Sequence, residues 1–309
     1  MQENLHNFPI RDAHAHFFGR SFFQALGKQI DGPAEAQTPE AITARLGWEL
    51  PPADNTELAS RWVQELDKHG VEQIALMASL PGDEGSVADA ARAFPDRIHG
   101  YFMLNPAAPD GLQRARNAVE KLGLRGICLF PAMHRYSVHD DGVRGVCELA
   151  AGRKGVVVFV HMGVLTVGVR KKLGLASKFD LSCSNPVDLH RVALEHPKVN
   201  FVIPHFGAGF FREALMLGDL CPNVHLDTSS TNSWVKYQTP GISLRDVFAK
   251  ALEIFGPKRL LFGSDSSFFP RGWNAAVLET QLPILQELEL SSEDRGAILG
   301  GNLQRLLAG

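Results

Sequence analysis

The sequence predicts an α/β fold, a (β/α)8 TIM barrel that forms a single domain with a long loop insertion after the first strand. Short apolar runs rich in β-branched residues alternate with segments of helical periodicity along the chain. Eight candidate strands begin near residues 8, 71, 98, 125, 156, 200, 223 and 259. No linker or shift in composition divides the 309 residues, and this length suits a barrel of about 250 residues with insertions. We therefore expect residues 1–309 to form one barrel domain.

The first half of the chain shows the alternation after one long connection. Residues 17–55 are too many for a structureless loop, so we expect short helices and a capping role there. The helix expected next has apolar side chains at helical spacing and ends at Gly70. In this half the expected strands cover residues 71–77, 98–104 and 125–130, and the expected helices residues 56–69, 85–94 and 111–122.

The second half continues the same pattern. Residues 156–160 are apolar and mostly β-branched, as a parallel strand buried on both faces requires. A loop over residues 162–184 leads to a helix over residues 186–195, with Asn185 as its N-cap. Further strands are expected at residues 200–204, 223–226 and 259–262, and helices at residues 142–151, 211–220, 244–255, 274–288 and 292–307. A doubly wound open sheet is the alternative, but its Gly-rich turn after the first strand is absent.

Composition excludes several functional classes. The formal net charge is −3 and the basic residues are scattered, so we expect no nucleic-acid partner. No apolar run approaches the roughly 20 residues that span a bilayer, so we expect no membrane association. The first four residues lack a basic and apolar export signal, which predicts a cytoplasmic protein. The four cysteines are far apart in sequence, so we expect buried free thiols.

Metal-binding residue types stand where strands end. His14 and His16 are two apart on the first strand and therefore share a face, about 7 Å apart along the backbone. His161, His205 and Asp265 each follow a later strand. Because a barrel assembles its site at the carboxyl ends of its strands, these five side chains predict one metal centre.

These segments resemble a known family. The motifs Asp12-Ala13-His14-Ala15-His16, Val160-His161-Met162-Gly163, Pro204-His205-Phe206-Gly207 and Phe262-Gly263-Ser264-Asp265 are similar to the metal and catalytic signatures of the amidohydrolase superfamily. The chain more closely resembles the amidohydrolase-related branch of aminocarboxymuconate-semialdehyde-decarboxylase-like proteins. The resemblance covers residues 8 to about 307 and implies a metal-dependent enzyme.

The resemblance also implies roles for these residues. His14, His16, His161 and Asp265 match metal ligands, and His205 matches the histidine that acts on the substrate or on the metal-bound water. Many binuclear members carry a carboxylated lysine at the end of the fourth strand, where this chain has Cys128 and no lysine nearby. We therefore expect one divalent ion, for which three histidines and one aspartate suit zinc best while permitting manganese or iron.

Three functions remain open. The first is a metal-dependent hydrolase of a small, carboxylated amide, ester or lactone, because a bound metal activates water and polarises a carbonyl group. In it, Asp265 and His205 exchange protons with the reacting groups. The second is a decarboxylase of an unsaturated or aromatic carboxylic acid on the same metal centre. The third is a catalytically silent scaffold stabilised by its metal.

The loops at the strand ends suggest how a small-molecule substrate is bound. Aromatic residues, among them Trp48, alternate there with arginines, which bind carboxylates in a bidentate fork. Arg135 and Arg271 lie just beyond strand ends and are the expected carboxylate ligands, whereas residues 170–172 are expected to be a solvated basic surface. Asp12 and Asp227 are expected to support the site by hydrogen bonding, and His134 and His139 are weaker candidates for reaching it. A homo-oligomer is compatible with the sequence.

Overall fold

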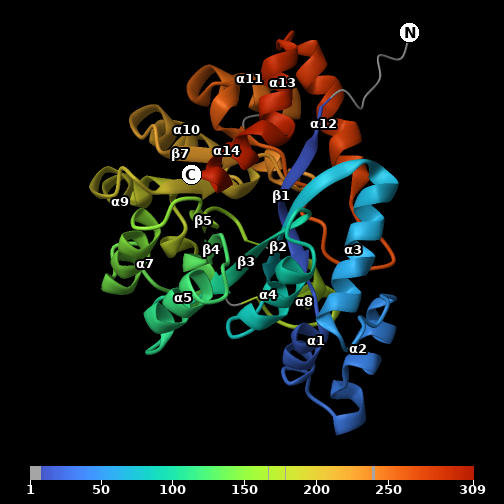
Figure 1. Cartoon of the computed structure of the whole chain (residues 1–309). Coiled ribbons are helices and arrows are strands. Elements are labelled where there is room, and N and C mark those ends of the chain that lie inside the picture. The colour runs from blue at the N-terminus through green and yellow to red at the C-terminus, as the bar shows by residue number, and fades with distance from the viewer. Residues whose placement is uncertain (1–7, 166, 178, 239–240) are drawn as a thin grey trace.

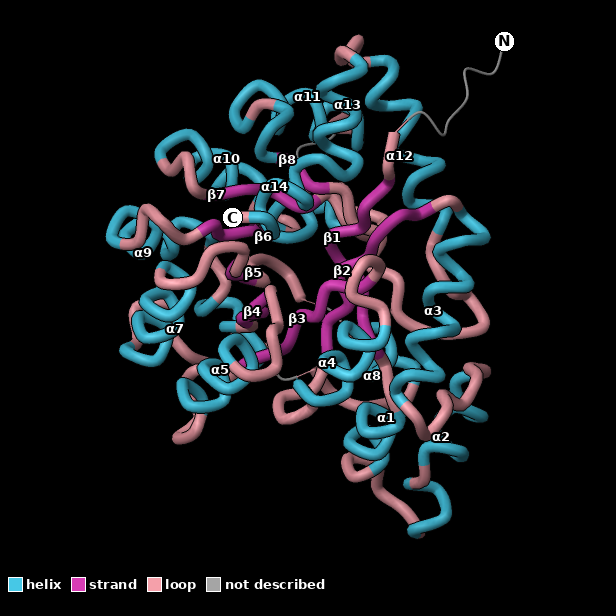
Figure 2. The backbone as a smooth tube through the Cα atoms, viewed as in Figure 1, coloured by secondary structure: helices cyan, strands magenta, loops and turns pink. Residues whose placement is uncertain are grey.

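The computed structural model describes residues 8–165, 167–177, 179–238 and 241–309, so the start of the chain, where we expect no export signal, lies outside the described residues. Eight parallel strands form one sheet in chain order, and helices surround it (Figures 1 and 2). The strands are β1 (Ile10–Phe17), β2 (Val71–Ala78), β3 (Ile98–Leu104), β4 (Gly126–Leu129), β5 (Val157–Val160), β6 (Asn200–Ile203), β7 (Val224–Asp227) and β8 (Leu260–Leu261). The predicted strand count and order are confirmed, and the doubly wound alternative is wrong.

The sheet curls until its two ends meet. The backbone N–H of Ala13 donates to the carbonyl oxygen of Phe262 over 2.9 Å, and that of Asp265 donates to the carbonyl oxygen of His14 over 2.9 Å. The N–H of His16 also donates to the carbonyl oxygen of Ser266 over 2.7 Å. These bonds join β1 to the segment after β8, so the first and last candidate site segments lie side by side.

The helices follow the predicted alternation closely. The structure has α3 (Asn55–His69), α4 (Glu84–Ala93), α5 (Gly111–Glu120), α6 (Pro131–His134), α7 (Asp141–Ala151), α9 (Leu189–Glu195), α10 (Phe211–Leu220), α11 (Leu244–Phe255), α12 (Ala275–Glu287), α13 (Ser292–Gly296) and α14 (Asn302–Ala308). Asn185 accepts a hydrogen bond from the backbone N–H of Val187, as predicted for an N-cap. The last expected helix is divided by a π-helical turn over residues 297–301. None of the described helices is long and apolar enough to cross a membrane.

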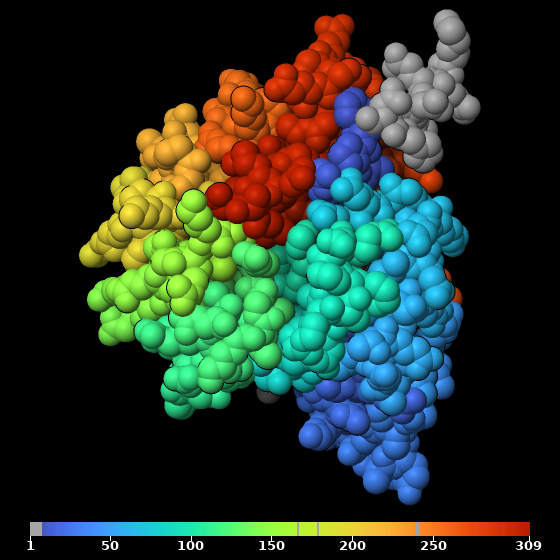
Figure 3. Space-filling view, in the orientation of Figure 1, coloured from blue at the N-terminus to red at the C-terminus, as the bar shows by residue number. Residues whose placement is uncertain are grey.

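Side chains of the strands alternate between two apolar layers. On β5, Val157 and Phe159 pack inside the barrel, whereas Val158 and Val160 pack against the outer helices. Leu303 and Leu306 of α14 join the inner cluster. These residues lie at the end of the barrel where the strands begin, and Figure 3 shows the C-terminal residues, in red, covering the middle of that end. Since this end is closed, the space for a ligand lies at the other end, beyond the carboxyl ends of the strands.

The long insertion after β1 folds into a cap, as predicted. It contains α1 (Arg20–Gly27), a short 3-10 helix (Ala34–Gln37) and α2 (Pro39–Leu46). Its apolar side chains form a cluster of their own with Val169 and Leu173 from the loop after β5. That loop, expected to lack secondary structure, contains the short helix α8 (Gly168–Lys172) and a 3-10 turn (Leu181–Cys183). The cap and the loop after β5 therefore pack together at the mouth of the barrel (Figure 1).

Candidate metal centre

His14 lies on an irregular part of β1. The register of β1 against β2 shifts between Asp12 and Ala15, so β1 holds one extra residue there. Ala13 packs inside the barrel, whereas Asp12 accepts a hydrogen bond from the indole of Trp273 in the outer layer over 2.8 Å. A regular strand would place Asp12 on the same face as His14, but the extra residue breaks the alternation and turns Asp12 outward. Its predicted hydrogen-bonding role is confirmed, since Asp12 also accepts from the backbone N–H of His14 over 2.9 Å.

Asp227, at the end of β7, fixes the orientation of the His14 ring. The Nδ1 of His14 donates to the Oδ2 of Asp227 over 2.6 Å, and both side chains are buried. Burial lowers the pKa of His14, but the charge and hydrogen bond of Asp227 outweigh it and raise this pKa. The Nε2 of His14 is buried and has no hydrogen-bond partner among the described residues. This nitrogen is therefore placed to bind a metal ion while Asp227 supports the ring.

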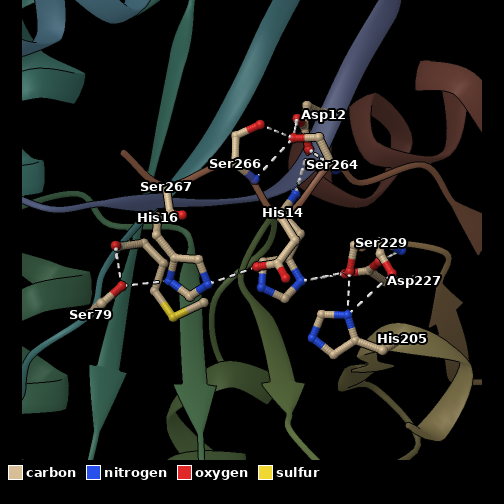
Figure 4. A network of polar contacts seen from close by, with 12 residues as sticks. Asp12, His14, His16, Ser79, His205, Asp227, Ser229, Ser264, Ser266 and Ser267 are labelled. Carbon is tan, nitrogen blue, oxygen red and sulfur yellow. Dashed lines mark hydrogen bonds and ion pairs between the residues drawn. The ribbon is translucent and has the colours of Figure 1, made fainter. Parts of the chain in front are cut away.

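His16 shows the same pattern with a serine as its support. Its Nδ1 lies 2.6 Å from the hydroxyl oxygen of Ser79, whose own hydrogen can be donated to the carbonyl oxygen of Met77 over 3.1 Å. The hydroxyl then accepts from Nδ1, which leaves Nε2 to face the site. The Nε2 of His16 lies 3.0 Å from the Oδ1 of Asp265. Figure 4 shows His14 between His16 on one side and Asp227, Ser229 and His205 on the other.

His161 brings a neutral ring to the centre. It is buried and stacks on Phe130, with ring centroids 3.9 Å apart and planes inclined by 18°. Burial, reinforced by the neighbouring histidines, lowers the pKa of His161 well below its usual value. Its Nδ1 is buried and lacks a partner in the described part of the chain. A neutral imidazole with an unpaired nitrogen is the form in which histidine binds metals.

His205 and Asp265 both follow strands in left-handed backbone conformations. Their φ values are 56° and 56°, which is uncommon for residues with a side chain and often marks a functional site. The segment around Asp265 can approach β1 because residue 263 is glycine: a Cβ there would lie 2.9 Å from the Cβ of His14 and 2.9 Å from that of Ser229. The Nδ1 of His205 lies 2.8 Å from the hydroxyl and 3.3 Å from the carbonyl oxygen of Ser229. A carbonyl oxygen only accepts, so Nδ1 carries the hydrogen and Nε2 keeps its lone pair.

The five predicted side chains converge. Two groups of ligand atoms, one on His14, His161 and His205 and the other on His14, His16 and Asp265, each lie within 4.8 Å of one another. Burial raises the pKa of Asp265, but its contact with His16 and the surrounding histidines outweigh burial and lower this pKa. Burial lowers the pKa of His205. The centre thus combines an ionised carboxylate with buried and partly buried imidazoles, which is a donor set suited to a divalent ion.

A cavity of about 580 Å³ opens beside this centre. His16, His161, His205 and Asp265 line it at the barrel end. Aromatic residues form one wall: Phe18 and Phe22 stack with centroids 3.8 Å apart, and Trp48 and Phe268 stack at 3.9 Å. The cavity therefore joins the metal-binding side chains to an apolar, aromatic surface.

The predicted substrate-binding residues are divided by the structure. Trp48 and Arg271 line the cavity, whereas Arg135 is exposed after α6 and is not among the lining residues. Arg271 donates to the carbonyl oxygen of Asp265 over 3.2 Å and to the hydroxyl of Ser267 over 3.1 Å. Burial lowers the pKa of Arg271. Of the two predicted carboxylate ligands, Arg271 is the one beside the candidate metal centre.

Other sequence expectations have mixed outcomes. Lys171 and Lys172 are exposed, as expected for a solvated surface, but Arg170 and Lys172 also line the cavity because α8 folds over the mouth. His139 is exposed, and His134 is partly buried but is not among the cavity-lining residues. Cys128 is buried in the inner cluster at the end of β4. Ser79 and Ser229 support the histidines and were missed, and their only sequence signal is their position just after a strand.

Comparisons with known proteins agree with this geometry. A family model described as amidohydrolase matches residues 12–308. A stretch of 87 residues is 36% identical to the protein fluG of Emericella nidulans, but it covers only 28% of this chain and 10% of that protein.

Solved structures share the fold over almost the whole chain. A 5-carboxyvanillate decarboxylase from Novosphingobium aromaticivorans, with bound manganese and 3-methoxy-4-hydroxy-5-nitrobenzoic acid, is 12% identical over 98% of each chain, with a TM-score of 0.66. An amidohydrolase from Burkholderia multivorans with bound zinc is 19% identical over 97% of this chain and 99% of that one, with a TM-score of 0.63. A probable 2-pyrone-4,6-dicarboxylic acid hydrolase from Acinetobacter baumannii, with bound citric acid, is 16% identical over 97% and 99%, with a TM-score of 0.60.

Proposed function

The chain belongs to the amidohydrolase family and is an enzyme of that superfamily, and from this premise we propose that it is a metal-dependent hydrolase of a small carboxylated amide, ester or lactone. It binds one divalent ion through His14, His16, His161 and Asp265. Zinc fits the donor set best, and manganese or iron is also compatible. Relatives of the same fold were solved with zinc and with manganese.

The observation that carries this proposal is the pair of unpaired nitrogens in the buried centre. The Nε2 of His14 and the Nδ1 of His161 have no hydrogen-bond partner among the residues that the structure describes. Leaving a buried polar atom without a partner costs about 1–3 kcal/mol, so such atoms call for a ligand. Both rings belong to one group of ligand atoms within 4.8 Å of one another. A metal ion held by these two nitrogens would satisfy both.

The support of His14 favours a single ion. Its Nδ1 is engaged by Asp227 over 2.6 Å, so the ring has one nitrogen left for a metal. His14 is shared by both groups of ligand atoms, and one nitrogen serves one ion. The absence of a lysine near Cys128 points the same way.

The reaction uses acid and base groups that the chain already places at the centre. When bound, a divalent ion lowers the pKa of water and polarises a carbonyl group. The carboxylate of Asp265 is ionised and accepts a proton from water. His205 keeps its Nε2 lone pair and transfers a proton at the substrate, while Ser229 holds its Nδ1. Arg271 binds the substrate carboxylate beside the reacting bond, and Trp48 packs against its apolar part.

A charge imbalance in the cavity supports an acidic substrate. Arg170, Lys172 and Arg271 line it, and among the described lining residues the one carboxylate is that of Asp265. Because Asp265 is assigned to the metal, the lining groups leave an excess of positive charge for the substrate. A small organic acid therefore matches both the charge and the aromatic wall.

A second candidate is decarboxylation of an unsaturated or aromatic acid at the same centre. The observation that favours it is the apolar wall of Phe18, Phe22, Trp48 and Phe268 around the cavity, since loss of carbon dioxide is favoured where a carboxylate is poorly solvated. The 5-carboxyvanillate decarboxylase of the same fold gives it a precedent.

One experiment separates the two reactions. The zinc-loaded and manganese-loaded protein is incubated with lactones, amides, esters and unsaturated or aromatic acids, and carbon dioxide and hydrolytic products are measured in the same samples. We expect acid or amine release that depends on added metal and is lost in His205→Ala. Carbon dioxide without hydrolytic product would assign the decarboxylase instead, and no metal-dependent product from any class would refute both.

A further inference from the structure

The outer surface around α9 and α10 exposes apolar side chains. Every large apolar side chain that is exposed in the described part of the chain lies between residues 181 and 237: Leu181, Val187, Leu194, Met216, Leu220 and Tyr237. Single exposed apolar residues are ordinary on a protein surface, whereas their gathering in one region marks an interaction site. The apolar surface on which a partner could dock is therefore found around these two helices.

Three of these side chains lie on the two helices themselves. Leu194 is on α9, and Met216 and Leu220 are on α10, with exposed fractions of 56%, 46% and 59%. The Nδ2 of Asn223, just after α10, donates to the carbonyl oxygen of Ala193 over 3.1 Å, which holds the end of α10 against α9. The two helices lie side by side on the outside of the barrel (Figures 1 and 2). None of the three apolar side chains lines the cavity, so this surface is separate from the candidate metal centre.

The exposed face of α10 carries opposite charges at its two ends. Arg212, Met216, Asp219 and Leu220 are spaced so that they share one face of the helix, and all four are exposed; we call this set the α10 face. The seven residues from Arg212 to Asp219 rise about 10.5 Å along the helix axis. Met216 lies midway between them. The α10 face is thus positive at one end, apolar in the middle and negative at the other end.

Both charges are available to a partner. The carboxylate of Asp219 forms no hydrogen bond or ion pair with a described residue, and its effect on Arg259 is through the electrostatic field. Arg212 forms an ion pair of 2.7 Å with its sequence neighbour Glu213, and its side chain is 81% exposed. An ion pair as exposed as this contributes little to stability, so Arg212 can exchange it for another carboxylate.

We propose that the α10 face binds a second copy of this chain, with the two α10 helices antiparallel across a two-fold axis beside Met216. In this arrangement Arg212 of each protomer faces the partner's Asp219, so one face supplies both halves of two ion pairs. The two Met216 side chains meet at the axis, where the flexible thioether adapts to its own copy, and Leu220 flanks them.

The charge pattern is the reason to choose a second copy over an unrelated protein. Opposite charges placed equally far from a central apolar residue become complementary to themselves after a two-fold rotation, and such complementarity fixes the partner and the register. The association goes beyond the proposed function and does not depend on it, because the α10 face lies outside the cavity.

Charge reversal tests both the surface and the antiparallel pairing. We expect sedimentation velocity of the wild-type protein, from low to high micromolar concentration, to show a monomer–dimer equilibrium. Arg212→Glu and Asp219→Arg each place like charges opposite each other twice in the dimer, so each is expected to weaken dimerisation at least about tenfold. When these two variants are mixed, both contacts pair opposite charges again, and we expect a heterodimer about as stable as the wild-type dimer. The Arg212→Glu/Asp219→Arg double variant is expected to dimerise equally well.

Two more variants test the apolar centre and the effect of charge alone. Met216→Glu places two carboxylates at the axis and is expected to leave the protein monomeric. Arg92→Glu is the matched control, because Arg92 is exposed and paired with Asp89 of its own helix, but lies on α4, away from α9 and α10 (Figure 1). We expect Arg92→Glu to dimerise as the wild type does. All these positions are exposed, and thermal melting checks that each variant folds.

The remaining outcomes overturn the proposal. A wild-type protein that stays monomeric over the whole concentration series would exclude a second copy as the occupant of the α10 face. A dimer that Met216→Glu leaves intact would place the interface elsewhere. A dimer that each charge reversal weakens, but that mixing the two variants does not restore, would refute the antiparallel pairing.

Discussion

Replacing Asp227 with asparagine tests whether the carboxylate behind His14 tunes the metal site. Asp227 and His14 are both buried, and the bond between them is 2.6 Å long. Asparagine preserves size and one oxygen acceptor but removes the negative charge. Because a metal on Nε2 makes the His14 ring more positive, the ionised carboxylate stabilises the bound state more than a neutral amide does.

The expected effect is a loss of about 10- to 100-fold in metal affinity, or about 1.4–2.7 kcal/mol. The substitution Asp227→Asn is also expected to lower the free energy of unfolding. One oxygen of Asp227 accepts from the imidazole of His14, and the other accepts from the backbone N–H of Ser229. The amide group of asparagine meets one of these two donors with an N–H of its own, which leaves a buried donor unpaired and costs about 1–3 kcal/mol.

Metal affinity is measured by competition with a chromogenic chelator, and urea unfolding of the metal-free protein gives the stability. Asp12→Asn is the matched control, because Asp12 is equally buried but accepts from the backbone N–H of His14, from Ser264 and from Trp273 rather than from the ring of a proposed ligand. We expect Asp12→Asn to lose stability while its folded fraction keeps the wild-type affinity. An unchanged affinity in Asp227→Asn, or an equal loss in both variants, would show that Asp227 does not tune the metal site through His14.

Three further predictions concern catalysis, packing and pH. His205→Asn is expected to retain its metal and to lose about 10²- to 10⁴-fold in turnover, and loss of the metal instead would make His205 a ligand. Gly163→Ala is expected to lower the free energy of unfolding by at least about 2 kcal/mol in urea melts, because its Cβ would lie 2.2 Å from the carbonyl oxygen of Gly207 at a φ of 93°, and a neutral effect would contradict this. Burial in the barrel, together with Arg305, lowers the pKa of His225 from 6.5 to about 4. Between these values the unfolded chain binds more protons, so this residue makes stability rise by about 3 kcal/mol from pH 4 to 6.5. In chelator-treated protein His225→Gln should reduce that rise, and an identical pH profile would contradict the assignment.

The strand ends could be predicted because a parallel barrel brings all carboxyl ends of its strands to one rim. The candidate site residues are distant in sequence, yet each could be found by locating the end of its own strand: His14, His161, His205 and Asp265. The order of strands follows the chain, so no long-range pairing had to be guessed. The convergence of these side chains was therefore within reach of the sequence.

The direction in which the Asp12 side chain points could not be predicted from the sequence. Strict alternation places Asp12, His14 and His16 on one side of the strand, but the extra residue between Asp12 and Ala15 turns Asp12 toward Trp273. A bulge in β1 depends on how β2 pairs with it, and the local pattern Asp-Ala-His-Ala-His carries no sign of one.

The walls of the cavity were also predicted only in part. Three adjacent basic residues are usual on a solvated surface, and Lys171 and Lys172 do lie exposed. Arg170 and Lys172 nevertheless also line the cavity, because apolar Val169 and Leu173 anchor α8 against the cap. Ser79 acts through one hydrogen bond to the ring of His16, and a single serine has no spacing pattern that would distinguish it from others.

The metal content of the purified protein, after stripping with a chelator and reloading with zinc, tests the proposed metal centre most directly. We expect one zinc per chain in the wild type, and content well below one in His14→Ala and in His161→Ala, with both variants still folded by thermal melting. A wild-type protein that binds no zinc, or that binds two ions, would contradict a single-metal centre on His14, His16, His161 and Asp265.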